Sequence, residues 1–314
     1  MILPTISDIQ SAHSRIRPFI HYTPVLTSRQ LNKIFDCELY FKCENLQRVG
    51  AFKFRGATNA VLQLSDAEKK RGVVTHSSGN HAAALALAAS MNGVKAHIVM
   101  PETAPVVKKN AVAGYGAEIT FCKPTLQARE ETTMSIMNNT GATLVHPYDN
   151  FNVICGQGTA SLELLSDKPD LDFVIAPIGG GGLMSGTSTC VKGLGSKAQV
   201  IGAEPLNAND AWKSFTSGQL TPSVNPITVA DGLLTSLSEL TFSIIRKNVD
   251  QILTASEESI IECMLLVWER MKIIIEPSSA TVLAVISENR EMFRGSKTGL
   301  IISGGNVDFR KLPF

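Results

Sequence analysis

The sequence predicts an α/β protein with two three-layer αβα domains and largely parallel sheets. Short apolar runs alternate with longer segments of helical spacing along most of the chain. Strands separated by helices of this length form right-handed βαβ units, whose strands lie parallel in one sheet. The chain has 314 residues, 44% of them hydrophobic, which is enough for one large or two ordinary domains.

The elements follow from residue spacing. Residues 6–19 have helical periodicity, residues 38–43 form a strand pattern, and residues 56–64 place their apolar side chains on one helical face. Beyond them, strands are predicted at 72–75, 96–100, 118–121, 143–145, 172–176, 199–203 and 298–302. Helices are predicted at 81–91, 105–113, 126–138, 156–165, 183–193, 256–271 and 277–288.

The alternation divides into two parts. We expect a small domain at 72–147, inserted into a large domain made of residues 1–71 and 148–314. A ligand site is expected between the two domains, because clefts at domain interfaces are where small molecules usually bind.

Composition excludes several classes of function. A formal net charge of +1 does not favour binding to nucleic acid or to a membrane surface, and the apolar runs are too short to cross a bilayer. The first 17 residues lack the apolar core of a secretory signal. The six cysteines are scattered without a C-x-x-C pair, which favours reduced thiols in a cytoplasmic protein over a zinc site.

Lys53 is the first candidate for catalysis. It lies in Gly50-Ala51-Phe52-Lys53-Phe54-Arg55-Gly56, among apolar residues and between two glycines. Burial lowers the pKa of a lysine and leaves a nucleophilic amine, as a Schiff base requires. The alternative is a surface lysine on an amphipathic strand.

The glycine run Gly179–Gly182 follows a predicted strand and opens a predicted helix. Backbone N–H groups at a helix N-terminus attract a phosphate, and glycine lets that phosphate approach closely. A P-loop is absent because no Gly-Lys-Ser/Thr follows. A dinucleotide fold stays open, since Glu204 lies where a ribose-binding acid would be. A purely structural turn also stays open.

Two further stretches follow predicted strands. Ser77-Ser78-Gly79-Asn80-His81 leads into an alanine-rich helix, where a serine could serve as an N-cap. Ser303-Gly304-Gly305-Asn306 ends the last strand, where Ser303 could be an ordinary turn residue. The loop from Glu204 to Asp210 carries two carboxylates six residues apart, which could also be plain surface acids.

Taken in this order, the four stretches around Lys53, Ser77, Gly179 and Ser303 resemble the fold-type II pyridoxal-phosphate (PLP) enzymes, with the tryptophan synthase β-like fold. The resemblance runs from Thr23-Pro24-Val25 to Gly305-Asn306-Val307-Asp308. The branch resembled is serine racemase of the eukaryotic type, beside threonine dehydratase and threo-3-hydroxyaspartate dehydratase.

The resemblance implies roles for individual residues. Lys53 would form the Schiff base, and Ser78 would be the acid–base group on the opposite face. Asn80 would contact the 3-oxygen of PLP and Ser303 its pyridine nitrogen, which a hydroxyl cannot hold protonated as a carboxylate would. The implied cofactor-binding set is Phe52, Lys53, Asn80, Gly179, Gly180, Gly181, Gly182, Leu183, Gly232 and Ser303. The implied substrate-binding set is Ser77, Ser78, Gly79, Asn80, His81 and Arg129.

The resemblance also implies a divalent-cation site and a nucleotide effector site. Glu204 and Asp210 with the Ala208 carbonyl would hold Mg²⁺, Ca²⁺ or Mn²⁺, since all-oxygen ligation suits hard cations. ATP would bind near Thr27, Ser28, Tyr115, Lys272 and Asn306. Arg48-Val49 departs from the family's lysine-threonine at that site.

The implied function is a PLP-dependent serine racemase with serine and threonine dehydratase (ammonia-lyase) activity, in a cytoplasmic homodimer. Ala51 stands where animal serine racemases have serine, and Val49–Gly56 with Tyr148-Asp149 looks more like the hydroxyaspartate dehydratases. The alternatives are therefore a threo-3-hydroxyaspartate dehydratase or an aspartate racemase on the same fold. An NAD-dependent oxidoreductase and a non-catalytic PLP- or nucleotide-binding protein are further alternatives.

Overall fold

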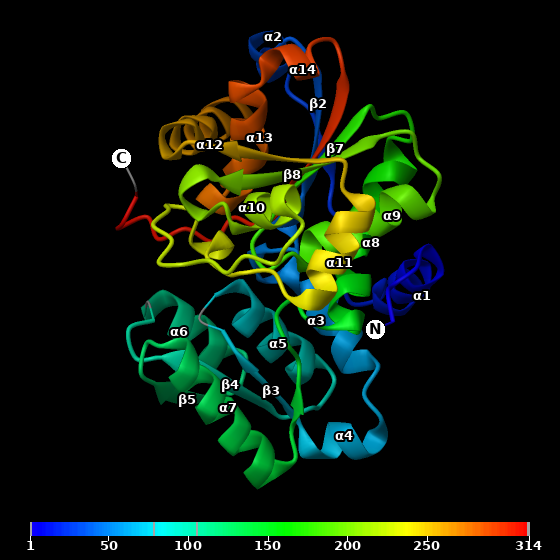
Figure 1. Ribbon diagram of the computed structural model, residues 1–314. Coiled ribbons are helices and arrows are strands. Elements are labelled where there is room, and N and C mark those ends of the chain that lie inside the picture. The colour runs from blue at the N-terminus through cyan, green and yellow to red at the C-terminus, as the bar shows by residue number, and fades with distance from the viewer. Residues whose placement is uncertain (1, 78, 105, 313–314) are drawn as a thin grey trace.

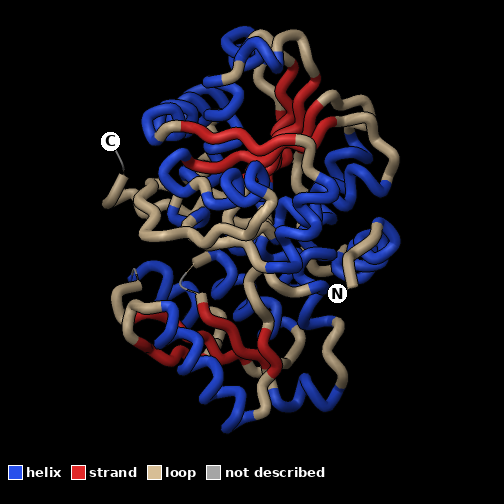
Figure 2. The backbone as a smooth tube through the Cα atoms, viewed as in Figure 1, coloured by secondary structure: helices blue, strands red, loops and turns tan. Residues whose placement is uncertain are grey.

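The protein folds around two separate sheets, which Figures 1 and 2 show in the upper and lower parts of the molecule. The structure is a computed structural model that describes residues 2–77, 79–104 and 106–312. The six-stranded sheet has the order β1-β2-β10-β7-β8-β9, and the four-stranded sheet has the order β5-β4-β3-β6. All neighbours are parallel except β1, which pairs antiparallel with β2. The predicted α/β class with largely parallel sheets is confirmed.

The strands of the large sheet are β1 (Val25–Leu26), β2 (Glu38–Cys43), β7 (Phe173–Pro177), β8 (Gln199–Pro205), β9 (Gln251–Ala255) and β10 (Lys297–Ile302). Those of the small sheet are β3 (Val73–His76), β4 (Ala96–Pro101), β5 (Glu118–Cys122) and β6 (Thr143–Leu144).

The α-helices are α1 (Ile6–Ile16), α2 (Arg29–Phe35), α3 (Lys53–Leu62), α4 (Asp66–Arg71), α5 (Asn80–Met91), α6 (Val106–Gly114), α7 (Leu126–Thr140), α8 (Phe151–Asp167), α9 (Gly182–Gly193), α10 (Asp210–Ser217), α11 (Glu239–Asn248), α12 (Glu257–Met271), α13 (Pro277–Glu288) and α14 (Arg290–Phe293). Short 3₁₀ turns are η1 (Glu44–Leu46), η2 (Arg48–Gly50), η3 (Leu206–Ala208) and η4 (Asp231–Leu233).

Each sheet is the middle of three layers, because successive side chains of a strand point to opposite faces. In the large sheet, Ile175 and Ile201 pack against α12 and α13, whereas Val174 and Val200 pack against α8 and α9. The strands of the small sheet likewise pack one face against α5 and the other against α7. Both faces of each sheet are therefore covered by apolar clusters.

Helix α8 begins five residues earlier than the sequence pattern predicts. Asn150 caps it by accepting a hydrogen bond from the Val153 N–H, and the helix continues through Gly156 and Gly158. The predicted helix began at Gly156, and both glycines lie inside the observed helix although glycine weakens a helix interior. They are needed for contact: a Cβ on Gly156 would lie 2.6 Å from the Gly56 Cα of α3, and one on Gly158 would lie 2.8 Å from the Gly186 carbonyl oxygen of α9.

Helix α3 likewise begins earlier than predicted, at Lys53 itself. It lies between the two cores, since it packs on α8 of the large sheet's layer and on α5 of the small sheet's layer (Figure 1). Among the described residues, no helix is long and apolar enough to cross a membrane.

Candidate active site

A cavity of about 510 Å³ opens between the two sheets. The loops that line it follow the carboxyl ends of β3, β7 and β10, the edge where open α/β sheets bind ligands. Every described residue of the predicted cofactor and substrate sets lines this one cavity: Phe52, Lys53, Ser77, Gly79, Asn80, His81, Arg129, Gly179, Gly180, Gly181, Gly182, Leu183, Gly232 and Ser303. Ser78 lies outside the described residues.

Lys53 is the first residue of α3, and its ammonium donates a hydrogen bond to the Pro147 carbonyl oxygen at 3.0 Å. Burial lowers the pKa of Lys53 to about 8, and the charge of Glu276 partly opposes this shift. At neutral pH an appreciable fraction of the amine is therefore unprotonated, which suits attack on an aldehyde.

The segment before Lys53 is held by the strand end opposite it. The Phe52 N–H donates to the Ser303 carbonyl oxygen at 2.9 Å, and the Gly305 N–H donates to the Gly50 carbonyl oxygen at 2.9 Å. Val49 has φ 55°, which is rare for a β-branched residue and is held by these contacts. The loop therefore presents Phe52 and Lys53 to the cavity in one fixed arrangement.

A buried ion network fixes α3 on the side away from the cavity. The Arg55 guanidinium donates to both oxygens of Glu44 at 2.7 and 2.9 Å and to both oxygens of Glu163 at 2.7 and 2.8 Å. Lys42 also donates to Glu163, at 2.6 Å. The hydrogen bond with His13 at 3.3 Å, together with Arg55 and Lys42, lowers the pKa of Glu163 to about 2 against the effect of burial. Two positive and two negative charges thus balance beneath the lysine-bearing turn.

The glycine loop forms a cradle at the N-terminus of α9. Gly181 has φ +84°, which favours glycine, and α9 begins at Gly182. A Cβ on Gly180 would lie 2.2 Å from the Tyr148 ring, and one on Gly179 would lie 3.0 Å from the Gly232 carbonyl oxygen. Side chains are therefore excluded where backbone N–H groups can receive a phosphate, so the residues fit the phosphate of PLP.

Ser303 ends β10 with only 3% of its surface exposed. Its hydroxyl lies 2.9 Å from the Ser279 hydroxyl, which in turn donates to the Gly304 carbonyl oxygen at 2.7 Å. The hydroxyl is thus fixed and uncharged, as a partner for a neutral ring nitrogen would be.

Comparisons with known proteins agree with this geometry. The family model described as pyridoxal-phosphate dependent enzyme matches residues 16–304. The chain belongs to this family. It is 51% identical over 317 residues to serine racemase of Dictyostelium discoideum, covering 99% of this chain and 98% of the relative. It is 48% identical to beta-hydroxyaspartate dehydratase of Paracoccus denitrificans, with both chains covered completely. The structure of maize serine racemase matches with a TM-score of 0.96 at 40% identity, covering 98% of this chain and 95% of that one.

Within this PLP-dependent enzyme, sequence reasoning missed Glu276. This acid precedes α13 and lines the cavity with 5% of its surface exposed. It accepts hydrogen bonds from the Asn80 side-chain nitrogen at 3.0 and 3.2 Å and from the Asn306 N–H at 3.2 Å. Burial raises the pKa of Glu276 to about 7. An acid between the apolar run 273–275 and Pro277 was the only sequence signal for it.

Histidines and cations gather on the small-sheet side of the cavity. The His81 ring nitrogen Nε2 lies 3.0 Å from the Val145 carbonyl oxygen, and burial lowers the pKa of His81 to about 3. Burial also lowers the pKa of His146 to about 4. The Nε of Arg129 is buried and has no hydrogen-bond partner within the part of the chain that the structure describes. Lys108 of α6 pairs with Asp231 of η4 at 2.7 Å across the two parts of the molecule.

The predicted cation ligands come together beside β8. Among the described residues, neither buried carboxylate oxygen of Asp210 has a hydrogen-bond partner of good geometry. Burial raises the pKa of Asp210 to about 6, although the nearby Ser223 hydroxyl and Leu237 N–H oppose this shift. Glu204 accepts from the backbone N–H groups of Ala211 and Trp212 at 2.9 and 2.7 Å, and burial raises its pKa to about 8. Buried carboxylate oxygens without donors fit a hard cation. Glu204 does not line the cavity between the two sheets, so it is not placed to bind the ribose of a dinucleotide there.

The residues of the predicted ATP site are distributed over several elements. Ser28 caps α2, Lys272 ends α12 in the left-handed region, and Tyr115 follows α6. The Asn306 side chain donates to the Val49 carbonyl oxygen at 2.7 Å and to the Asn80 side-chain oxygen at 2.9 Å. The ATP site therefore stays a prediction.

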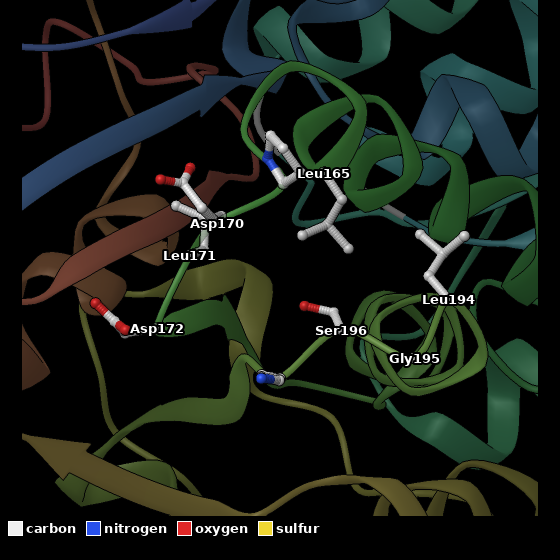
Figure 3. Close-up of a pocket in the computed structure, with 9 residues that line it drawn as sticks. Leu165, Asp170, Leu171, Asp172, Leu194, Gly195 and Ser196 are labelled. Atoms are coloured by element: carbon white, nitrogen blue, oxygen red, sulfur yellow. The ribbon is translucent and has the colours of Figure 1, made fainter.

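A second cavity, of about 490 Å³, lies at the opposite ends of β7 and β8 (Figure 3). Its acids are engaged within the protein: Asp170 pairs with the Lys297 ammonium, and Asp172 accepts from the Lys297 N–H at 2.8 Å. It offers no comparable set of residues for the cofactor, so the cavity between the two sheets is the candidate active site.

Proposed function

We propose that the protein is a PLP-dependent serine racemase that also dehydrates serine or threonine with release of ammonia. The observation that carries the proposal is Lys53, a lysine with a lowered pKa that shares a cavity with a glycine cradle and an uncharged Ser303. A relative named serine racemase is 51% identical over nearly the whole chain, which supports the same activity here.

Different residues of the cavity would bind different parts of the cofactor and transfer protons. Lys53 would hold the cofactor's aldehyde, Gly179–Leu183 with Gly232 its phosphate, Asn80 its 3-oxygen and Ser303 its ring nitrogen. When bound, PLP supplies an aldehyde for the amino group and a ring that stabilises negative charge at Cα. The Lys53 amine, once released by the incoming substrate, accepts the α-proton from one face. Ser78 would supply a proton from the other face.

A second candidate is a threo-3-hydroxyaspartate dehydratase or an aspartate racemase. The relative named beta-hydroxyaspartate dehydratase is 48% identical over the full length. Arg129 lines the cavity, and its buried Nε has no hydrogen-bond partner among the described residues, which gives this side of the cavity a cation that suits a second carboxylate.

Further features belong to the same proposal. The two sheets would be the cores of a small domain at 72–147 and a large domain at 1–71 and 148–314. Glu204, Ala208 and Asp210 would bind Mg²⁺ or Ca²⁺, and ATP would act as an effector near Asn306. The active form would be a cytoplasmic homodimer.

The test is an assay of the purified protein, reconstituted with PLP, on L-serine, D-serine, L-threonine, L-aspartate and threo-3-hydroxyaspartate. Chiral chromatography measures racemisation, and keto-acid release measures dehydration. We expect both products from serine, and neither from the Lys53→Ala variant. Keto acid from threo-3-hydroxyaspartate with inert serine would favour the second candidate. No product from any of the five would contradict both.

A further inference from the structure

Glu276 is a buried acid of the cofactor cavity to which neither the sequence motifs nor the proposed reaction gives a role. We propose that Glu276 is a positioning residue: its carboxylate fixes the orientation of the Asn80 amide, and it supplies the negative charge opposite the Lys53 nitrogen. This inference rests on the proposed function and deepens it.

The backbone holds Glu276 in place. Its N–H donates to the Gly304 carbonyl oxygen at 3.0 Å, and its carbonyl oxygen accepts from the N–H groups of Ser279 and Ala280 in the first turn of α13. A Cβ on Gly304 would lie 2.8 Å from the Glu276 Oε1. The carboxylate therefore has little room to turn away from the cavity.

The contacts of the carboxylate decide which way Asn80 faces. The Asn80 side-chain nitrogen donates to both carboxylate oxygens at 3.0 and 3.2 Å, the arrangement that suits the ionised form, which only accepts hydrogen bonds. The Asn80 oxygen then faces the Asn306 side-chain nitrogen at 2.9 Å. Asn80 lines the cavity at the start of α5, so the carboxylate of Glu276 sets which edge of the Asn80 amide a ligand there meets.

The positive charge that Glu276 can balance is that of Lys53. The titratable groups around Glu276 are Lys108 of α6 and Asp231 of η4, and those around Lys53 are Glu276 and the two histidines His81 and His146, whose pKa values burial lowers. Lys108 is already paired with Asp231 at 2.7 Å. The charge of Glu276 raises the pKa of Lys53 against the effect of burial. At the N-terminus of α13 the helix dipole also favours the ionised carboxylate.

The two effects have separate consequences. Loss of the negative charge makes a positive charge on the Lys53 nitrogen less stable, so the cofactor bound there should lose its proton at lower pH. Loss of the acceptor lets the Asn80 amide turn, so the affinity for PLP should fall. Glu276→Gln removes the charge at nearly constant shape and puts an N–H₂ group against the Asn306 N–H or the Asn80 nitrogen.

The experiment measures two quantities on protein reconstituted with PLP: the pH midpoint of the cofactor's visible absorbance change and the Kd for PLP. For Glu276→Gln we expect the midpoint to fall by about one pH unit or more, as for loss of a close opposite charge. We expect the Kd to rise about tenfold or more, as for loss of a hydrogen bond to a charged group.

Glu288→Gln is the matched control. Glu288 lies at the other end of α13 and accepts from the Ser256 N–H at 3.0 Å, away from the cavity. Its midpoint and Kd should equal those of the unchanged protein. An unaltered midpoint in a folded Glu276→Gln variant that binds PLP overturns the proposal.

The design distinguishes failure of the role proposed for Glu276 from failure of the proposed function. If Glu276→Gln does not fold, Glu276→Asp keeps the charge and shortens its reach: we expect a weaker Kd with a nearly unchanged midpoint, and a midpoint that falls as far as one unit would contradict the charge role. If the unchanged protein does not bind PLP at Lys53, the proposed function fails as well. If the unchanged protein binds PLP at Lys53 and the Glu276→Gln variant has the same midpoint and Kd, only the role of Glu276 is contradicted.

Discussion

At the scale of single residues, burial changes what Lys53 can do. Its pKa moves from 10.5 to about 8, because the surrounding protein disfavours the ammonium. At pH 7 the free-amine fraction is then roughly 300-fold larger than that of an ordinary lysine. This gain requires no neighbouring base, only the packing of α3 between two cores.

The rate at which PLP attaches to the apo-protein should follow this pKa. Attack needs the neutral amine, so the rate should rise with pH up to about 8 and level off above it. The measurement is the growth of visible absorbance after mixing with PLP, with Nα-acetyl-lysine as the control for the ionisation of PLP itself. A rate that keeps rising to about pH 10 would show a lysine with an ordinary pKa.

Ser78→Ala should separate racemisation from dehydration. Racemisation needs proton-transfer groups on both faces of Cα, whereas loss of the hydroxyl from the L-substrate needs Lys53 on one face. Removing one positioned acid–base group costs about 10²- to 10⁴-fold. We expect racemisation and D-serine dehydration to fall by that order while L-serine dehydration largely survives. Equal losses of all three would assign Ser78 to loop structure or carboxylate binding.

The sequence could predict the residues that lie in motifs, but not those brought in from a distance. Lys53, Asn80, Gly179 and Ser303 each stand in a recognisable stretch after a strand or before a helix. Glu276 meets Asn80 across 196 residues of sequence, and nothing near either residue signals the other. Such pairs form because the two sheets face each other in one arrangement. Local sequence periodicity gives no information about that arrangement.

At the scale of elements, α8 determines where α3 and α9 lie. Glycines on α8 face glycines on both neighbours, so the backbones touch where side chains would separate them. The predicted helix contained these glycines but began at Gly156, so the sequence pattern missed the first turn of α8, which Asn150 caps. The same close approach sets the distance between the lysine-bearing turn and the glycine cradle.

Gly156→Ala should therefore destabilise the protein and weaken cofactor binding. The new Cβ would lie 2.6 Å from the Gly56 Cα and 2.7 Å from the Arg55 carbonyl oxygen. Overpacking of this kind costs about 1–3 kcal/mol of unfolding free energy, measured by denaturant unfolding. The control is Gly114→Ala, where a Cβ meets nothing within 4 Å and where the exchange should leave stability unchanged or raise it. Equal stabilities of the two variants would contradict the packing account.

At the scale of the whole molecule, a cation beside β8 would stabilise the fold from outside the cavity. Among the described residues, the two buried carboxylate oxygens of Asp210 have no donor in good geometry, which costs free energy unless a cation lies beside them. Mg²⁺ or Ca²⁺ at 100 times its Kd would stabilise the native state by about 2.7 kcal/mol. EDTA should lower the Tm, and either cation should restore it.

Asp210→Asn is the variant that checks this assignment. We expect its Tm to be insensitive to both EDTA and added cation. Asp250→Asn, which removes a carboxylate that pairs with Lys192 at 2.6 Å on the surface, should keep the full response. A response to cation that persists in Asp210→Asn would move the site elsewhere.

The central claim is that Lys53, at the junction of the two cores, carries the cofactor. The most direct measurement is borohydride reduction of the PLP-reconstituted protein, followed by proteolysis and mass spectrometry of the modified peptide. The account predicts one phosphopyridoxyl group, on the peptide that contains Lys53, and none when glycine-cradle binding is blocked by excess inorganic phosphate. A modification on another lysine, or none at all, would contradict it.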